Sequence, residues 1–127
     1  MVQLSTNEAA KLAGLTFRQL DYLVRQDVVQ RQPPKRYNKR GWDADTIHRL
    51  QVAAALAKVS GNLGGRPFSQ LPAIMRAVNA SFEPVPARFV GLSDGQVYYM
   101  DSAVSVAAFA SIGGIVAPMP TLWKEET

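Results

Sequence analysis

Apolar positions near the amino terminus repeat at helical spacing, and capping residues bracket them. Residues 5–8 read Ser-Thr-Asn-Glu, a capping box in which a hydroxyl accepts from a first-turn amide and the glutamate reaches back. Apolar residues follow at helical spacing over 9–13, and Gly14 can take the left-handed conformation that ends a helix. Thr16 and Gln19 then offer a second capping box. The pattern predicts two short helices that meet across a tight turn.

The second predicted helix has two unlike sides. At about 100° per residue, one side collects apolar residues and the opposite side collects two arginines and a tyrosine. These three stand at i, i+4 and i+7, so they can all reach one groove of a DNA duplex. The apolar side comprises Phe17, Leu20, Leu23 and Val24, and the other side comprises Arg18, Tyr22 and Arg25.

A basic stretch and a long helix follow. Residues 30–41 read QRQPPKRYNKRG, with five cations and no acid, and the two prolines forbid a helix. This composition predicts a basic loop or hairpin. Asp43 then caps a helix that ends at Gly61, and an apolar stripe marks the side that we expect to be buried. The stripe consists of Ile47, Leu50, Ala54 and Ala57.

The strongest local signal lies in residues 87–101, where two β-rich runs flank Asp94-Gly95. This pair is favoured in the two-residue type I′ turn of a hairpin. Such a turn fixes the pairing register and leaves large apolar groups on both faces. One face pairs Leu92 with Val97, Val90 with Tyr99 and Arg88 with Asp101, and the other pairs Phe89 with Met100 and Gly91 with Tyr98.

Three further elements complete the predicted order. We expect a helix over roughly 69–79 with Pro72 in its first turn, a helix over 102–112 that glycines stop, and a short strand over 115–117. The fold class is therefore α+β. A mainly helical winged helix-turn-helix domain over 1–80 precedes a hairpin-helix-strand module over 81–127.

Composition excludes several classes of protein. The chain has 127 residues, no cysteine and one histidine, which rules out a disulfide framework and a His/Cys metal cluster. No apolar run approaches the roughly 18 residues needed to cross a bilayer, and the first residues lack the pattern of a signal peptide. We expect a cytoplasmic protein with no metal, cofactor or membrane partner, and not an enzyme.

Charge is distributed unevenly along the chain. Residues 1–66 carry eleven Lys and Arg against five acids, a net charge of +6, whereas residues 67–127 carry three against five, a net charge of −2. A basic half joined to a slightly acidic half is typical of a polyanion-binding module with an accessory module. Charge alone also fits a solvated basic surface with no partner.

The residues that follow the first predicted helix carry a family resemblance. Residues 14–29 read GLTFRQLDYLVRQDVV, which resembles the signature of MerR-like DNA-binding regulators. Residues 40–50 read RGWDADTIHRL, similar to the wing-to-helix passage of that family, with Trp42 where tyrosine is usual. The resemblance covers roughly residues 3–80 and implies a winged helix-turn-helix that binds DNA. The matching positions in the first stretch are Gly14, Thr16, Arg18, Leu20, Tyr22 and Arg25.

The chain also departs from the MerR-like pattern. Asp21 stands where the family usually carries a phosphate-contacting arginine, and Asp27 replaces the glycine before the wing. Both changes imply a weaker or shifted contact with DNA. The family's long carboxy-terminal dimerisation helix is absent, so metal or drug sensing is not carried over, and the sequence identifies no effector.

The candidate DNA contacts come from the second helix and the basic stretch. The single histidine, His48, is expected at the solvent or at a phosphate edge rather than as a catalytic base. Trp42 is expected in the core. The candidate contacts are Thr16, Phe17, Arg18, Gln19, Tyr22, Arg25, Lys35, Arg36, Tyr37, Lys39 and Arg40.

These observations predict a sequence-specific regulator that binds double-stranded DNA. We expect a repressor, from a genome of high GC content or its phage because alanine is frequent. One alternative is an excisionase, or recombination directionality factor, which uses a similar winged helix to bend DNA. Another is a protein-interaction adaptor without DNA affinity, which Asp21 and Asp27 favour.

The two apolar faces of the hairpin raise the question of assembly. The module's own helix can cover only one face, so either the helix at 69–79 folds back on the other or a second copy does. We expect the second case, a homodimer that would read paired half-sites about 34–36 Å apart. The candidate dimer residues are Phe89, Tyr98 and Met100.

Overall fold

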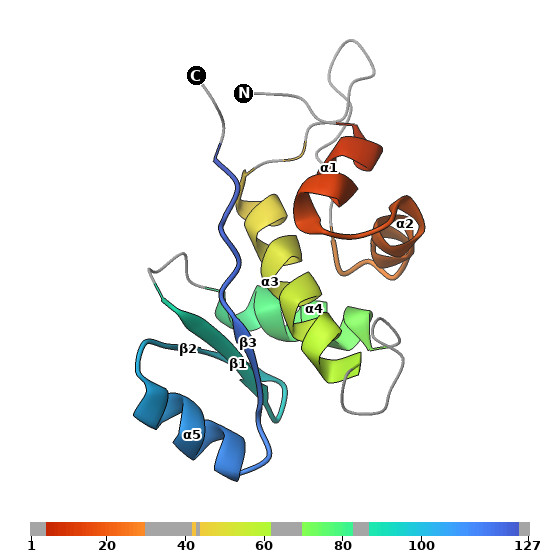
Figure 1. The fold of residues 1–127 in the computed structure, drawn as a ribbon. Coiled ribbons are helices and arrows are strands. Elements are labelled where there is room, and N and C mark those ends of the chain that lie inside the picture. Colours follow the sequence, from red (N-terminus) through yellow and green to blue (C-terminus); the bar gives the residue numbers. More distant parts are fainter. Residues whose placement is uncertain (1–4, 30–41, 43, 62–69, 83–86, 125–127) are drawn as a thin grey trace.

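Helix α3, Ala44–Gly61, lies at the centre of the fold and contacts α1, α4 and the strands β1 and β3 (Figure 1). The computed structural model describes residues 5–29, 42, 44–61, 70–82 and 87–124. These residues form five helices and one three-stranded antiparallel sheet, which confirms the predicted α+β class. The other helices are α1, Thr6–Ala13, α2, Phe17–Arg25, α4, Leu71–Ser81, and α5, Ala103–Ser111, and the strands are β1, Phe89–Ser93, β2, Gln96–Met100, and β3, Ile115–Pro118.

The amino-terminal helices begin and end where the capping pattern predicts. At α1 the Glu8 amide donates to Ser5 Oγ at 3.1 Å, and the Ser5 amide donates to the Glu8 carboxylate at 3.1 Å. Gly14 follows α1 in the left-handed conformation, with φ of 79°. The same reciprocal pair then caps α2. Both predicted capping boxes are confirmed.

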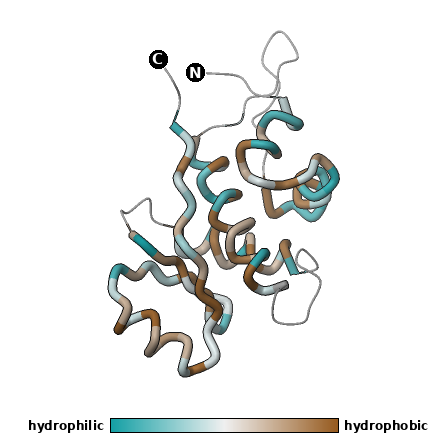
Figure 2. Tube along the Cα trace, in the orientation of Figure 1, coloured by the Kyte–Doolittle hydropathy of each residue, from teal (hydrophilic) through white to brown (hydrophobic). Residues whose placement is uncertain are grey.

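The core gathers around α3, as its apolar stripe predicts. All four predicted stripe residues are buried, and α4 packs along the same helix with its proline in the first turn. Trp42 is 1% exposed, which confirms its expected place in the core. Figure 2 shows the apolar colouring along the inner side of α3 and α4. No helix among the described residues is both long and apolar enough to span a membrane.

The sheet has the strand order β2-β1-β3, and the four predicted hairpin pairs that lie within β1 and β2 are in register. The fifth predicted pair lies beyond the strands, where the Arg88 amide donates to the Asp101 carboxylate at 3.1 Å. Asp94 and Gly95 both have positive φ, 49° and 73°, as a type I′ turn requires. The predicted third strand pairs antiparallel with β1 and faces it over residues 115–118.

The two faces of the sheet are both covered by helices of the same chain. On one face, α4 contacts β2, and Val90 and Val97 are buried. On the other face, the ring of Phe109 in α5 lies edge-on to Tyr98, with centroids 5.3 Å apart. The alternative in which the helix at 69–79 folds back onto the sheet is therefore the one observed. Neither sheet face therefore needs a second copy to cover it.

The residues after β3 run back along α3 and are fastened to it through their main chain (Figure 1). The side-chain amide of Gln51 makes both contacts. Its Nε2 donates to the Thr121 carbonyl at 3.0 Å, and its Oε1 accepts from the main-chain amide of Trp123 at 2.9 Å. His48 Nε2 lies 2.6 Å from the Trp123 carbonyl oxygen, and the ring is partly buried. His48 was predicted at the solvent or at a phosphate edge, and this prediction is wrong because the last strand's extension covers that side of α3.

Candidate nucleic-acid interface

Helices α1 and α2 are joined by a tight turn that main-chain hydrogen bonds fix. The Leu15 amide donates to the Ala10 carbonyl at 2.9 Å, and Leu15 itself is buried. Leu20 and Leu23 of α2 are fully buried against the core, which holds one side of the helix in place. The opposite side of α2 is left in solvent, as the sequence predicts.

That solvent side of α2 combines aromatic and cationic groups. Phe17 is 51% exposed and Tyr22 is 49% exposed, and Arg18 and Arg25 are both exposed. The predicted juxtaposition of Arg18, Tyr22 and Arg25 on one helix face therefore holds in the structure.

Phe17 differs from its sequence assignment to the apolar side of α2. Leu20 and Leu23 mark the buried side of α2, and Phe17 points about 90° away from that side. Phe17 is also the first residue of the helix. Its ring therefore extends past the edge of the core instead of entering it. This position agrees with its other assignment, as a candidate contact.

Arg25 is not free in the structure. Its Nε lies 3.0 Å from Oδ2 of Asp21, one turn earlier on α2. The Arg25 side chain is 77% exposed and the Asp21 side chain 30%, so water screens the pair and its stabilising effect is on the order of 0–1 kcal/mol. A phosphate can compete with a pair of this strength. Arg18 has no ion-pair partner among the described residues.

Two of the candidate contacts are used within the protein. Thr16 Oγ1 accepts from the Gln19 amide at 3.1 Å, and the Thr16 amide donates to Gln19 Oε1 at 2.8 Å. Both side chains therefore set the start of α2. Their contribution to an interface is the orientation of the helix.

The segment that follows α2 is anchored on α4. Asn79 Nδ2 donates to the Val28 carbonyl at 2.8 Å, and Val28 and Val29 are buried. Asp27, where the MerR-like pattern has glycine, takes a left-handed conformation with φ of 60°. Aspartate is one of the few residues other than glycine that tolerates this conformation.

The remaining candidate contacts belong to the predicted wing. The basic stretch of residues 30–41 lies outside the described part of the chain. The candidates within it are Lys35, Arg36, Tyr37, Lys39 and Arg40.

The candidate dimer residues are less exposed than the sequence predicts. Met100 is buried and Phe89 is half-buried, whereas Tyr98 is 42% exposed beside Phe109. On α5, the side away from the sheet also leaves an apolar group in solvent, because Val104 is 81% exposed. The helix has no buried residue, and Figure 2 shows apolar colouring along it.

Comparisons with protein-family models, with curated proteins and with solved structures give no match.

Proposed function

We propose that the protein binds double-stranded DNA through α2 and regulates transcription, with repression as the expected direction. The observation that carries this proposal is the exposed face of α2, where Arg18 and Tyr22 stand side by side at i and i+4. Arginine can fork to guanine O6 and N7 in the major groove. The positive charge of residues 1–66 and the resemblance to MerR-like regulators support the same conclusion.

The rigid support of α2 is a second argument for DNA recognition. Two capping boxes, a buried turn and the Asn79 anchor hold both ends of the helix-turn-helix. A recognition helix needs such support, because its side chains must meet base edges in a fixed geometry.

We further propose that the active species is a homodimer that associates through the outer side of α5. This helix carries no charged residue, and Val104 and Ile112 are 81% and 72% exposed. Two copies that meet there would bury apolar groups that one copy leaves in water.

The test of the proposal is binding to duplex DNA at several salt concentrations. We expect affinity to fall steeply as the salt concentration rises. A plot of the logarithm of the association constant against the logarithm of the salt concentration should have a slope of about −0.9 for each phosphate neutralised. Arg18→Ala should relax sequence preference, whereas Lys39→Ala should weaken binding to all sequences alike and make the slope shallower. If the two variants behave alike, the division of roles between α2 and the basic stretch is wrong.

A genome-wide binding map then separates the candidate functions. Peaks at promoters support a regulator. A single peak at an attachment site favours the excisionase alternative. If the map shows no peaks and binding in vitro is not salt-sensitive, the proposal is refuted. The exposed face of α2 would then be a protein-docking surface.

A further inference from the structure

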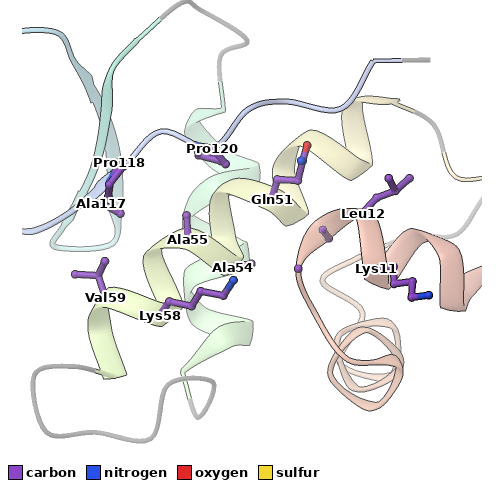
Figure 3. Close-up of a pocket in the computed structure, with 12 residues that line it drawn as sticks. Lys11, Leu12, Gln51, Ala54, Ala55, Lys58, Val59, Ala117, Pro118 and Pro120 are labelled. Atoms are coloured by element: carbon purple, nitrogen blue, oxygen red, sulfur yellow. The ribbon is translucent and has the colours of Figure 1, made fainter. Parts of the chain in front are cut away.

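A groove of about 390 Å³ lies between α1, α3 and the end of β3 (Figure 3). Its lining is mostly apolar, with small residues of α3 opposite prolines that follow the last strand. The volume is at the lower end of the range for small-molecule sites, which is about 300–1,000 Å³. The apolar lining residues are Leu12, Ala13, Ala54, Ala55, Val59, Ala117, Pro118 and Pro120.

A single ammonium group extends across this groove. Figure 3 shows the Lys58 side chain leaving α3 and pointing toward α1. Its Nζ would lie 3.3 Å from a Cβ placed on Gly14, so it closely approaches the turn after α1. Lys11 stands on α1 at the other edge and points outward.

Neither lysine is neutralised within the described part of the chain. The ion pairs there join Arg25 to Asp21 and Arg49 to Asp45, and no carboxylate among the groove residues faces Lys58. Both ammonium groups are exposed, so a carboxylate at the rim of the groove would form a charge-assisted hydrogen bond with Lys58 that solvent partly screens.

We propose that this groove binds a small amphipathic carboxylate, with its apolar body on Leu12, Ala55 and Val59 and its carboxylate at the Lys58 ammonium. The chemical class follows from the lining. One spanning cation suits one negative charge, and a polyphosphate would bring more charge than Lys58 and Lys11 can balance in an apolar groove.

A purely structural role for Lys58 makes a different prediction. A lysine near the end of α1 stabilises that helix through the dipole of its last turn, with or without ligand. In that case Lys58→Gln would lower stability and leave ligand binding unaffected. The proposal instead requires that the same substitution lower affinity.

The experiment titrates sodium octanoate into the full-length protein and follows backbone amide shifts by NMR. Saturable shifts at Leu12, Ala55 and Val59 are expected, together with a rise in melting temperature. Octan-1-ol, with the same body and no charge, should bind more weakly by up to about fivefold, because an exposed charge pair contributes up to about 1 kcal/mol.

Three variants complete the test. Lys58→Gln should weaken octanoate binding by up to about fivefold, and Lys124→Gln, an exposed lysine outside the groove, should not change it. Ala55→Leu should abolish binding by filling the groove, with folding checked by circular dichroism. No saturable binding, shifts outside the groove, equal binding of octan-1-ol, or unchanged affinity in Lys58→Gln would each overturn the proposal. The result does not depend on DNA binding, which is measured separately on the same variants.

Discussion

The carboxylate of Asp21 lies 3.0 Å from Nε of Arg25, so an acid on the exposed face of α2 holds one of the two arginines that face solvent there. Asp21 also stands where MerR-like regulators usually carry a phosphate-contacting arginine. Asp21 lowers the attraction of this face for a phosphate in two ways, because its carboxylate repels the phosphate and pairs with Arg25. If the proposed DNA binding holds, the Asp21 carboxylate would therefore compete with DNA phosphates for Arg25.

We expect Asp21→Asn to tighten DNA binding by about three- to tenfold at low salt. The substitution removes a negative charge and frees Arg25, and each change is worth a few tenths to about 1 kcal/mol at an exposed site. Fluorescence anisotropy with a labelled duplex measures the effect. Asp45→Asn is the matched control, because it breaks an i, i+4 pair with Arg49 on α3 instead of α2. Equal gains in both variants would show that only net charge matters.

Asp27→Gly should raise the free energy of unfolding by up to about 1 kcal/mol. Asp27 has φ of 60°, a conformation that costs an L-residue about 1–2 kcal/mol and glycine little, although glycine is more flexible when unfolded. Urea denaturation gives the difference. Asp94→Gly, at φ of 49° in the hairpin turn, is the control for strain far from α2. Only Asp27→Gly should also tighten DNA binding, because only that acid adjoins the interface. A destabilised Asp27→Gly protein would show that the Asp27 side chain is itself needed.

The amino-terminal capping box should make stability depend on pH in the acid range. Hydrogen bonds from the Ser5 backbone and hydroxyl hold the pKa of the Glu8 carboxyl below its usual value. Because the folded pKa is lowered, this contribution is present above the ordinary glutamate pKa and is lost as the pH falls through the lowered one. Ser5→Ala should cost about 1 kcal/mol at neutral pH.

Glu8→Gln provides the control for that pH effect. Glutamine can keep a hydrogen bond to the Ser5 amide but does not titrate. Denaturant titrations at neutral and acidic pH should therefore show a smaller change in stability for this variant than for the wild type. An identical pH profile in the two proteins would mean that Glu8 does not contribute.

The attachment of α5 to the sheet should be sensitive to the size of two glycines. A Cβ on Gly91 would lie 2.7 Å from the Phe109 ring, and one on Gly114 would also contact that ring closely. We expect Gly91→Ala to cost about 1–3 kcal/mol through overpacking. Phe109→Leu added to Gly91→Ala should cost less than the sum of the two single changes, because the shorter side chain relieves the contact. Additive costs would show that the ring is not what excludes the methyl group.

The homodimer proposal predicts that α5, and not the sheet, controls self-association. Val104→Asp should raise the dissociation constant at least about tenfold and leave the fold intact, because the residue is 81% exposed. Ala80→Asp, exposed on α4, is the control. Sedimentation velocity distinguishes the outcomes. A monomeric wild type, or a dimer unaffected by Val104→Asp, would contradict the proposal.

Local signals in the sequence predicted local structure well. The two capping boxes, the left-handed Gly14 and the Asp94-Gly95 turn each depend on neighbouring residues, so their elements are confirmed with nearly the expected bounds. The pair of Asp21 and Arg25 was also readable, since i, i+4 spacing brings such side chains together on a helix.

Tertiary relationships were less accessible. His48 contacts a carbonyl 75 residues later, and no local pattern reports such a contact. Whether α4 or a second copy covers the sheet also depends on how distant elements pack, which no local pattern reports. The groove of Lys58 was missed because its walls come from α1, α3 and the end of β3, which meet only in the folded chain.

The two hydrogen bonds from the Gln51 side chain to the main chain of residues 121 and 123 affect how the protein folds. The contact closes a loop of 70 to 72 residues, so it cannot form until residue 123 has been synthesised. Closing a loop of this length lowers the folding rate, because the chain loses conformational entropy before the contact forms and stabilises the fold. On the ribosome, α3 would therefore present an uncovered flank until residues 121–123 have emerged. These residues complete the surface of the helix around which the rest is organised.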